Sequence, residues 1–256
     1  MTMADDFDVQ GRGEFYEETG AIRDVVQNHL FQIMTILAME PPVKADSESI
    51  RDEKVKVLKA IPPLDKRNVV LGQFRGYRQE KGVAQDSRVE TFAALRLEVN
   101  SWRWQGIPFY IRAGKRLPVT CTEIIVQLRK PLEIYPSTLE SNYLRLRVSP
   151  EPTIAIGMIV MAPGEEMVGQ SVEMIASRQP ESDGVGAYER LLTHAMEGDT
   201  TLYARKDIVE EAWRILDPIL KTDISVCEYE PGTWGPPEVE KRVTPVGGWQ
   251  NPTVTD

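Results

Sequence analysis

The residue best suited to chemistry in this chain is a histidine inside a segment with helical periodicity. Around His29, apolar residues recur at spacings of three and four, which predicts an amphipathic helix with the imidazole directed toward the core. These apolar residues are Ile22, Val25, Val26, Ile33, Ile36 and Leu37. The pKa of an unperturbed imidazole lies near neutrality, so a partly buried histidine is a candidate general base. From the helix position alone, however, a core histidine bonded to a backbone carbonyl is the favoured interpretation.

Two charged residues have both a structural and a functional interpretation. Asp24 falls near the start of the same helix, where a carboxylate interacts favourably with the helix dipole and could also contact a ligand. Lys115 follows Gly114 at the end of a strand-like run, where the backbone can bend toward a ligand. An ammonium is a suitable point charge for a phosphate or a group of hydroxyls, whereas the structural alternative is an exposed lysine at a strand end. His194, the only other histidine, lies on another predicted helix and is interpreted as structural or as a surface residue.

Proline pairs set the limits of the first predicted helices. A helix is predicted over residues 21–39, ahead of Pro41 and Pro42, and a second over residues 47–61, ahead of Pro62 and Pro63. Ser47 is the candidate N-cap of the second helix.

The middle of the chain predicts strands. Residues 91–99 alternate between apolar and more polar side chains, as expected of a strand with one buried face. Further strands are predicted over 110–112, 124–129, 143–148, 153–161 and 170–176, and helices over 187–198 and 207–216. Short links between successive strands favour antiparallel hairpins and meanders. The order of elements predicts an α+β fold.

Composition indicates one soluble domain. The 256 residues are 41% hydrophobic, and no linker or repeat divides residues 1–256. A net charge of −9 and a pI near 5.0 argue against nucleic acid as a partner. No run of eighteen apolar residues predicts a membrane span, and the first residues do not resemble a signal peptide. Cys121 and Cys227 indicate neither a disulfide framework nor a metal site, so the cytoplasm is the expected location.

Several motifs, in order along the chain, carry a resemblance to a known family. The first is residues 22–29 (Ile-Arg-Asp-Val-Val-Gln-Asn-His), which resemble the catalytic helix of the glucose-6-phosphate dehydrogenases. Other matching segments are 38–42, 50–58, 68–74, 90–94, 102–109, 112–118 (Arg-Ala-Gly-Lys-Arg-Leu-Pro), 187–192, 211–215 and 229–236. The matches stay in order from about residue 3 to residue 249, and they resemble the carboxy-terminal half of the bacterial-type enzymes.

The resemblance implies a fold, a reaction and a site. The implied fold is a large, mostly antiparallel sheet with helices on one face and the opposite face used in dimer formation. The implied reaction oxidises glucose 6-phosphate to 6-phosphogluconolactone with NADP, the first step of the pentose phosphate pathway. In the implied site, His29 is the base, and Asp5, Asp24 and Lys115 contact the substrate. Many relatives carry a second cation five residues after the lysine, where this chain has Thr120.

Two family features have no counterpart in the sequence. A dinucleotide site needs a strand, a glycine-rich turn and a helix amino terminus, but Gly11 and Gly13 are better explained as turn glycines, and no third glycine follows Gly184 and Gly186 before a helix. The family's coenzyme domain is therefore expected to be absent. So is the Arg-Ile-Asp-His-Tyr-Leu-Gly-Lys-Glu block, which in relatives supplies phosphate ligands and the carboxylate that orients the catalytic histidine.

Two functions follow from this reading. The chain is expected to be the substrate-binding and dimerisation half of an NADP-dependent enzyme, inactive until a coenzyme domain completes it. The alternative is a non-catalytic module, or a truncated fragment, that associates with a full-length enzyme. Retention of His29, Asp24 and Lys115 favours the first function, and Thr120 slightly favours the second. A homo-oligomer or a complex with a coenzyme-domain partner is expected in both cases, because an unpaired half would expose apolar surface.

Overall fold

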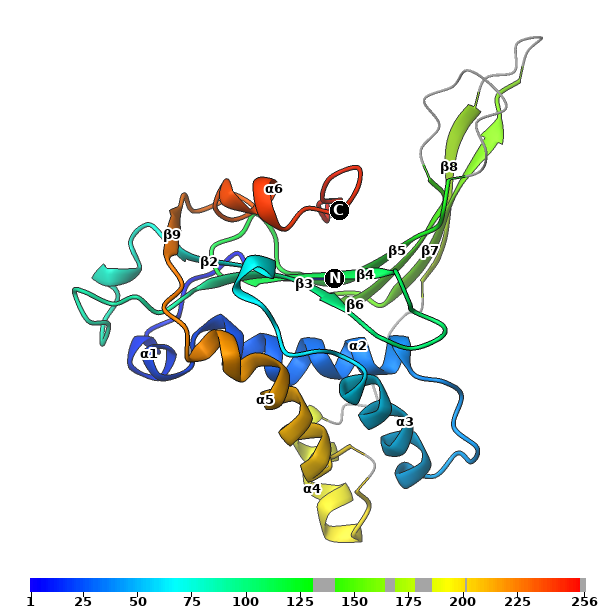
Figure 1. The fold of residues 1–256 in the computed structure, drawn as a ribbon, viewed down its shortest axis with the longest axis horizontal. Helices are drawn as coiled ribbons and strands as arrows, with labels where there is room; N and C mark the ends of the chain where they lie inside the picture. The colour runs from blue at the N-terminus through cyan, green and yellow to red at the C-terminus, as the bar shows by residue number, and fades with distance from the viewer. Residues whose placement is uncertain (131–140, 164–168, 178–185, 201, 254–256) are drawn as a thin grey trace.

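A nine-stranded sheet organises the chain (Figure 1). The computed structural model describes residues 1–130, 141–163, 169–177, 186–200 and 202–253. The strand order is β8-β7-β6-β5-β1-β4-β3-β2-β9. The strands are β1 (Thr2–Ala4), β2 (Val69–Phe74), β3 (Phe92–Glu98), β4 (Pro108–Gly114), β5 (Cys121–Gln127), β6 (Tyr143–Ser149), β7 (Thr153–Met161), β8 (Gly169–Ser177) and β9 (Val226–Tyr229).

Most strand pairs are antiparallel, as the short links predicted. Strands β5 to β8 form a meander, and β3 pairs antiparallel with both β2 and β4. Two pairs are parallel: β1 with β4, and β2 with β9. Each parallel pair joins segments far apart in sequence. The short strand β1 lies between β4 and β5, with Thr2 opposite Arg112 and Glu123.

The helices form a layer mainly on one face of the sheet, as the family resemblance implied. Helices α1 to α5 lie on that side, and the short helix α6 lies on the other (Figure 1). The helical elements are α1 (Gly13–Ala21), η1 (Ile22–Leu30, a π-helical segment), α2 (Phe31–Ala38), α3 (Ser47–Lys59), η2 (Lys66–Asn68), η3 (Tyr77–Gln79), α4 (Ala187–Glu197), α5 (Lys206–Leu220) and α6 (Glu238–Arg242). None of the helices in the described ranges is long and apolar enough to cross a membrane.

Strand alternation divides the core into two layers. Along β3, Ala93, Leu95 and Leu97 pack with residues of η1, α2, α3 and α5. The alternate residues Phe92 and Ala94 pack on the opposite face, in a cluster with Val239 and Val243 from α6 and its end. The central strands are therefore buried on both faces.

The face opposite the main helical layer is closed around a buried arginine. The guanidinium of Arg112 lies 4.4 Å from the ring centroid of Trp234 and 4.5 Å from that of Trp249. It donates to Thr2 Oγ1 at 3.0 Å and to Asn251 Oδ1 at 2.8 Å. Burial lowers the pKa of Arg112 to about 10. The carboxy-terminal segment thus covers central strands on the face that the resemblance assigned to dimer formation.

The predicted helix over residues 21–39 is wrong in its continuity and its phase. The backbone is non-helical at Gly20, near the end of α1, and again at Asp24, within the π-helical segment η1, which α2 follows. The buried positions are Ile22, Val26, Leu30, Phe31, Met34, Thr35 and Ala38. His29 and Ile36, predicted to face the core, are exposed. A π-helical segment has more residues per turn than an α-helix, so a pattern counted at 3.6 residues per turn loses phase across it.

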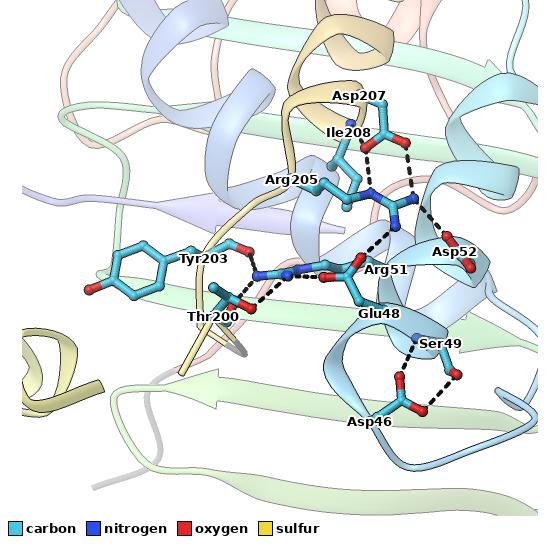
Figure 2. A network of polar contacts seen from close by, with 10 residues as sticks. All are labelled: Asp46, Glu48, Ser49, Arg51, Asp52, Thr200, Tyr203, Arg205, Asp207 and Ile208. Atoms are coloured by element: carbon cyan, nitrogen blue, oxygen red, sulfur yellow. Dashed lines mark hydrogen bonds and ion pairs between the residues drawn. The ribbon is translucent and has the colours of Figure 1, made fainter. Parts of the chain in front are cut away.

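Helix α3 begins at Ser47, as predicted, but its N-cap lies one residue earlier than the predicted cap. Asp46, and not Ser47, is the N-cap, and its carboxylate accepts from the Ser49 N–H at 2.8 Å (Figure 2). The predicted helix over 207–216 is observed as α5, which extends to Leu220 through Pro218.

Two arginines join α3 to the chain segment that leads into α5 (Figure 2). Arg51 is nearly buried, and its guanidinium donates to the Thr200 hydroxyl and carbonyl and to the Tyr203 carbonyl. Arg205 reaches back to Glu48 at 2.8 Å and Asp52 at 2.7 Å. Residues about 150 positions apart are thereby held together.

We expect Arg51→Ala to lower the free energy of unfolding by about 2–4 kcal/mol, because a nearly buried guanidinium and its charge-assisted bonds to two backbone carbonyls are lost. Arg67→Ala removes a pair that is largely exposed, with Asp65, and should cost less than about 1 kcal/mol. Urea denaturation followed by circular dichroism measures both values. Equal, small effects of the two substitutions would contradict a structural role for the Arg51 contacts.

Candidate functional site

The centre of the candidate site is an ion pair between two predicted residues. Lys115 Nζ lies 2.7 Å from Asp5 Oδ2, and the lysine is nearly buried while the carboxylate is partly exposed. The two residues are 110 positions apart in sequence. The structure therefore brings together a cation and a carboxylate that the sequence could place only separately.

Backbone pairing fixes both partners of this ion pair. The Asp5 N–H donates to the Gly114 carbonyl at 3.0 Å, and the Asp5 carbonyl accepts from the Leu117 N–H at 2.9 Å. These bonds continue the parallel pairing of β1 with β4 beyond the last strand residue. Arg116, at the turn between them, has a φ of 53°. Because the backbone is held on both sides of Asp5, the two charged groups are preorganised.

Aromatic rings form the wall beside the lysine. Lys115 Nζ lies 4.6 Å from the ring centroid of Phe7 and 5.9 Å from that of Tyr16. Burial and the nearby Glu90 carboxylate raise the pKa of Tyr16 well above its ordinary value, and Asp24 adds to this shift. Tyr16 is therefore a neutral hydroxyl, and its ring lies beside Lys115. Sequence reasoning missed Phe7 and Tyr16, because an aromatic residue in an amphipathic segment carries no signal beyond packing.

Asp24 and His29 both lie on η1, about one turn apart. Asp24 Oδ1 accepts from Asn28 Nδ2 at 2.9 Å, and Asn28 Oδ1 accepts from the His29 backbone N–H at 2.6 Å. No hydrogen bond or ion pair within the described ranges joins the His29 imidazole to Asp5 or Lys115. His29 is exposed, so a ligand or another protein surface can reach it.

The break that begins η1 is explained by the fit of Gly20 against Glu90. Gly20 adopts φ 62° and ψ 177°, and a Cβ at this position would lie 2.5 Å from Glu90 Oε1. Only glycine has neither the steric penalty of this φ nor a side chain to clash. The Glu90 carbonyl accepts from Ala21 N–H at 2.9 Å, and Glu90 Oε1 accepts from Ile22 N–H at 3.1 Å.

Thr120 takes part in a local contact at the position where many relatives have a cation. Its hydroxyl donates to Asp6 Oδ1 at 2.6 Å and accepts from Asp6 N–H at 3.0 Å. The loop after β1 is thus held to the segment between β4 and β5 without a second positive charge.

The glycines of the first loop serve the fold. Gly11 has a φ of 74°, and a Cβ on Gly13 would lie 2.4 Å from the Lys81 carbonyl oxygen. The positive φ of Gly11 and the close packing at Gly13 account for them as turn and packing glycines. Gly184 lies outside the described residues. Across the described ranges, no group of three or more His, Cys, Asp or Glu side chains is arranged to hold a metal ion.

A cavity of about 330 Å³ lies away from the candidate residues. It opens between β4 and β5, and its lining is mostly apolar, including Trp104, Phe109, Ile124 and Trp249. Such a lining offers few groups for a phosphate, so the charged cluster defines the candidate site better than cavity size does.

Comparison with known proteins identifies the class of domain that this sheet and charged cluster represent. Residues 1–250 match the family model described as "Glucose-6-phosphate dehydrogenase, C-terminal domain". The chain therefore belongs to the glucose-6-phosphate dehydrogenase C-terminal domain family.

Curated glucose-6-phosphate 1-dehydrogenases are similar in sequence to nearly all of this chain. It is 38% identical over 257 residues to glucose-6-phosphate 1-dehydrogenase 1 of Mycobacterium tuberculosis, covering 98% of this chain and 54% of the relative. It is 39% identical over 275 residues to the glucose-6-phosphate 1-dehydrogenase of Aggregatibacter actinomycetemcomitans, covering 99% and 56%. The chain spans about half the length of the curated relatives it matches.

Solved structures agree on the fold. The glucose-6-phosphate 1-dehydrogenase of Mycobacterium avium superposes with a TM-score of 0.90 at 40% identity, covering 100% of this chain and 56% of that one. A glucose-6-phosphate dehydrogenase solved in complex with its substrate glucose 6-phosphate superposes with a TM-score of 0.86 at 32% identity, covering 98% and 55%. The expected α+β architecture is thus confirmed.

We expect Gly20→Ala to disturb the start of η1, because the new methyl group would meet the Glu90 carboxylate. The free energy of unfolding should fall by at least about 2 kcal/mol, the cost of an alanine at positive φ plus the clash. Gly106→Ala is the matched control, since Gly106 has a φ of 77° with open space around it, and should cost only about 1 kcal/mol. Chemical denaturation of both variants measures the difference, and equal losses would contradict the steric role of Glu90.

Proposed function

We propose that the chain is the substrate-binding half of a glucose-6-phosphate dehydrogenase. The observation that carries the proposal is the preorganised Lys115–Asp5 pair beside the rings of Phe7 and Tyr16, in a domain of this family. A sugar phosphate requires a cation for its phosphate and acceptors for its hydroxyls, and this cluster supplies both.

Each predicted residue has a role in this proposal. The Lys115 ammonium binds the phosphate or an adjacent hydroxyl, and Asp5 and Asp24 accept hydrogen bonds from sugar hydroxyls. The His29 imidazole takes the proton of the anomeric hydroxyl as general base, which its exposure on η1 permits. NADP is the proposed hydride acceptor. It is bound mainly by a coenzyme domain, and residues 1–256 are expected to lack the glycine-rich turn of that domain. Catalysis is then expected only when such a domain completes the site, in the cytoplasm and within the pentose phosphate pathway.

Association is part of the proposal. The described parts of β7, β8 and α4 expose large apolar side chains: Ile154, Ile156, Val160, Met161, Met174, Ile175, Tyr188, Leu192 and Met196. Such surface favours a homo-oligomer or a complex with a coenzyme-domain partner. The same exposed surface supports the alternative function, a non-catalytic module that associates with a full-length enzyme.

Binding can be tested on this chain without any coenzyme. We expect isothermal titration to detect glucose 6-phosphate binding, and Lys115→Met to weaken it at least about tenfold by removing a charged donor. Lys206→Ala is the control, since that lysine is exposed at the start of α5. Equal affinities for Lys115→Met and the parent chain, with both folded, would exclude Lys115 as a ligand.

Catalysis is tested by NADPH formation from glucose 6-phosphate with the purified chain, alone and mixed with a separately expressed coenzyme domain of a relative. We expect activity only on mixing, and its loss by at least about 100-fold in His29→Ala, because general-base catalysis contributes at least that much. Activity of the chain alone would contradict the proposal that a separate coenzyme domain is required. No activity on mixing, with the chain folded and oligomeric by light scattering, would favour the non-catalytic module.

A further inference from the structure

Glu90 is a buried carboxylate for which the proposed reaction has no role. It lies two residues before β3, and its side chain is nearly inaccessible to solvent. Burial raises the pKa of Glu90, partly offset by hydrogen bonds to it and by Arg23. Within the described part of the chain no arginine or lysine is bonded to the Glu90 carboxylate, so its burial needs another explanation.

The first set of contacts made by Glu90 is to the start of η1. Because the chain turns at Gly20, the N–H groups of Ala21 and Ile22 begin a new helical segment and need acceptors from elsewhere. Glu90 supplies both, one from its carbonyl and one from its carboxylate. Glu90 therefore does the work of an N-cap, although it comes from a distant part of the chain. The capped residue Ile22 lies two residues before Asp24.

The next residue makes the second set of contacts, to the lysine side of the site. The Thr91 carbonyl accepts from the Lys115 N–H at 2.9 Å. Tyr229 closes the same unit, since its hydroxyl donates to the Lys115 carbonyl at 2.6 Å and lies 3.2 Å from Thr91 Oγ1. Thr91 is itself fixed in the sheet, because its N–H donates to the Gly72 carbonyl and its hydroxyl accepts from Phe74 N–H.

We propose that Glu90 is a positioning residue, which with the adjacent Thr91 sets the spacing between the η1 residues Asp24 and His29 and the Lys115–Asp5 pair. Two neighbouring residues just before β3 hold the two halves of the site, so neither half can shift without breaking a hydrogen bond to this segment. The link of this spacing to substrate rests on the proposed function.

The contact to Ile22 requires an acceptor oxygen of the right length, and a charge is not essential to it. Glutamine keeps this oxygen and the side-chain length, whereas alanine removes the acceptor and leaves space beside Gly20. Glu90→Gln should therefore retain the geometry of the site, and Glu90→Ala should lose it. Glu98→Ala, at the far exposed end of β3, is the matched control for loss of a nearby carboxylate that does not contact η1.

The first measurement reports on the geometry alone. Residual dipolar couplings of the backbone N–H groups of residues 24–29 and 114–117 give the relative orientation of the two segments in each variant. We expect this orientation, and the slow hydrogen exchange of the Ile22 amide, to change in Glu90→Ala and to be retained in Glu90→Gln and Glu98→Ala. An unchanged orientation in Glu90→Ala would overturn the proposal, whether or not the chain binds glucose 6-phosphate.

The second measurement connects geometry to binding. Under conditions where circular dichroism shows every variant to be folded, titration with glucose 6-phosphate should give an affinity about tenfold lower in Glu90→Ala, the effect of one buried hydrogen bond. Affinity should be restored in Glu90→Gln, a rescue that general destabilisation would not produce. No binding by the parent chain would refute the proposed function and leave the couplings to decide the role of Glu90. Equal binding by the parent chain and Glu90→Ala would overturn the positioning role.

Discussion

The candidate site depends on the pairing of the first five residues with the end of β4. Strand β1 has only three residues, yet it lies between β4 and β5 and has hydrogen-bonded neighbours on both sides. This parallel pairing carries Asp5 to the position beside Lys115, at a separation of 110 residues. Pairing two distant segments costs the conformational entropy of closing the loop between them. Parallel strands are therefore stable mainly where both faces of the sheet are covered. Here the helical layer covers one face and the segment around Trp249 covers the other.

A broken helix provides the second half of the site. An unbroken α-helix over the same residues would keep every N–H bonded within the helix and would direct its apolar stripe along one line. Gly20 and Glu90 instead begin a new segment at Ile22, and the π-helical turn that follows leaves Ile22, Val26 and Leu30 buried while His29 is exposed. π-Helical segments often occur at functional positions because they change the direction of side chains without ending the helix. The irregular backbone of η1 thus leaves the His29 imidazole exposed, at the cost of regular helical hydrogen bonding.

Burial decides whether a polar contact of this chain stabilises the fold or can bind a ligand. The Arg51 network joins α3 to the segment before α5 through bonds to backbone carbonyls, and so contributes to the fold. The Lys115–Asp5 pair is partly open on the carboxylate side, so a ligand can compete for the ammonium. A fully enclosed pair would be too costly to separate, and a fully exposed one would be too loose to orient a substrate.

The sequence by itself determined the fold class, most of the strands and the residues worth considering. Alternation along β3 and β7, and the short links in the meander, gave the antiparallel sheet because neighbouring strands interact locally. The motifs around His29 and Lys115 gave the family. Only the tertiary structure decided that Asp5 meets Lys115, that the Tyr16 ring lies beside Lys115, and that His29 is exposed. These depend on distant backbone pairing and on a helix break caused by Glu90, a residue some 70 positions away from Gly20. Periodicity describes how a segment relates to its own neighbours, and it carries no information about which distant acceptor will interrupt it.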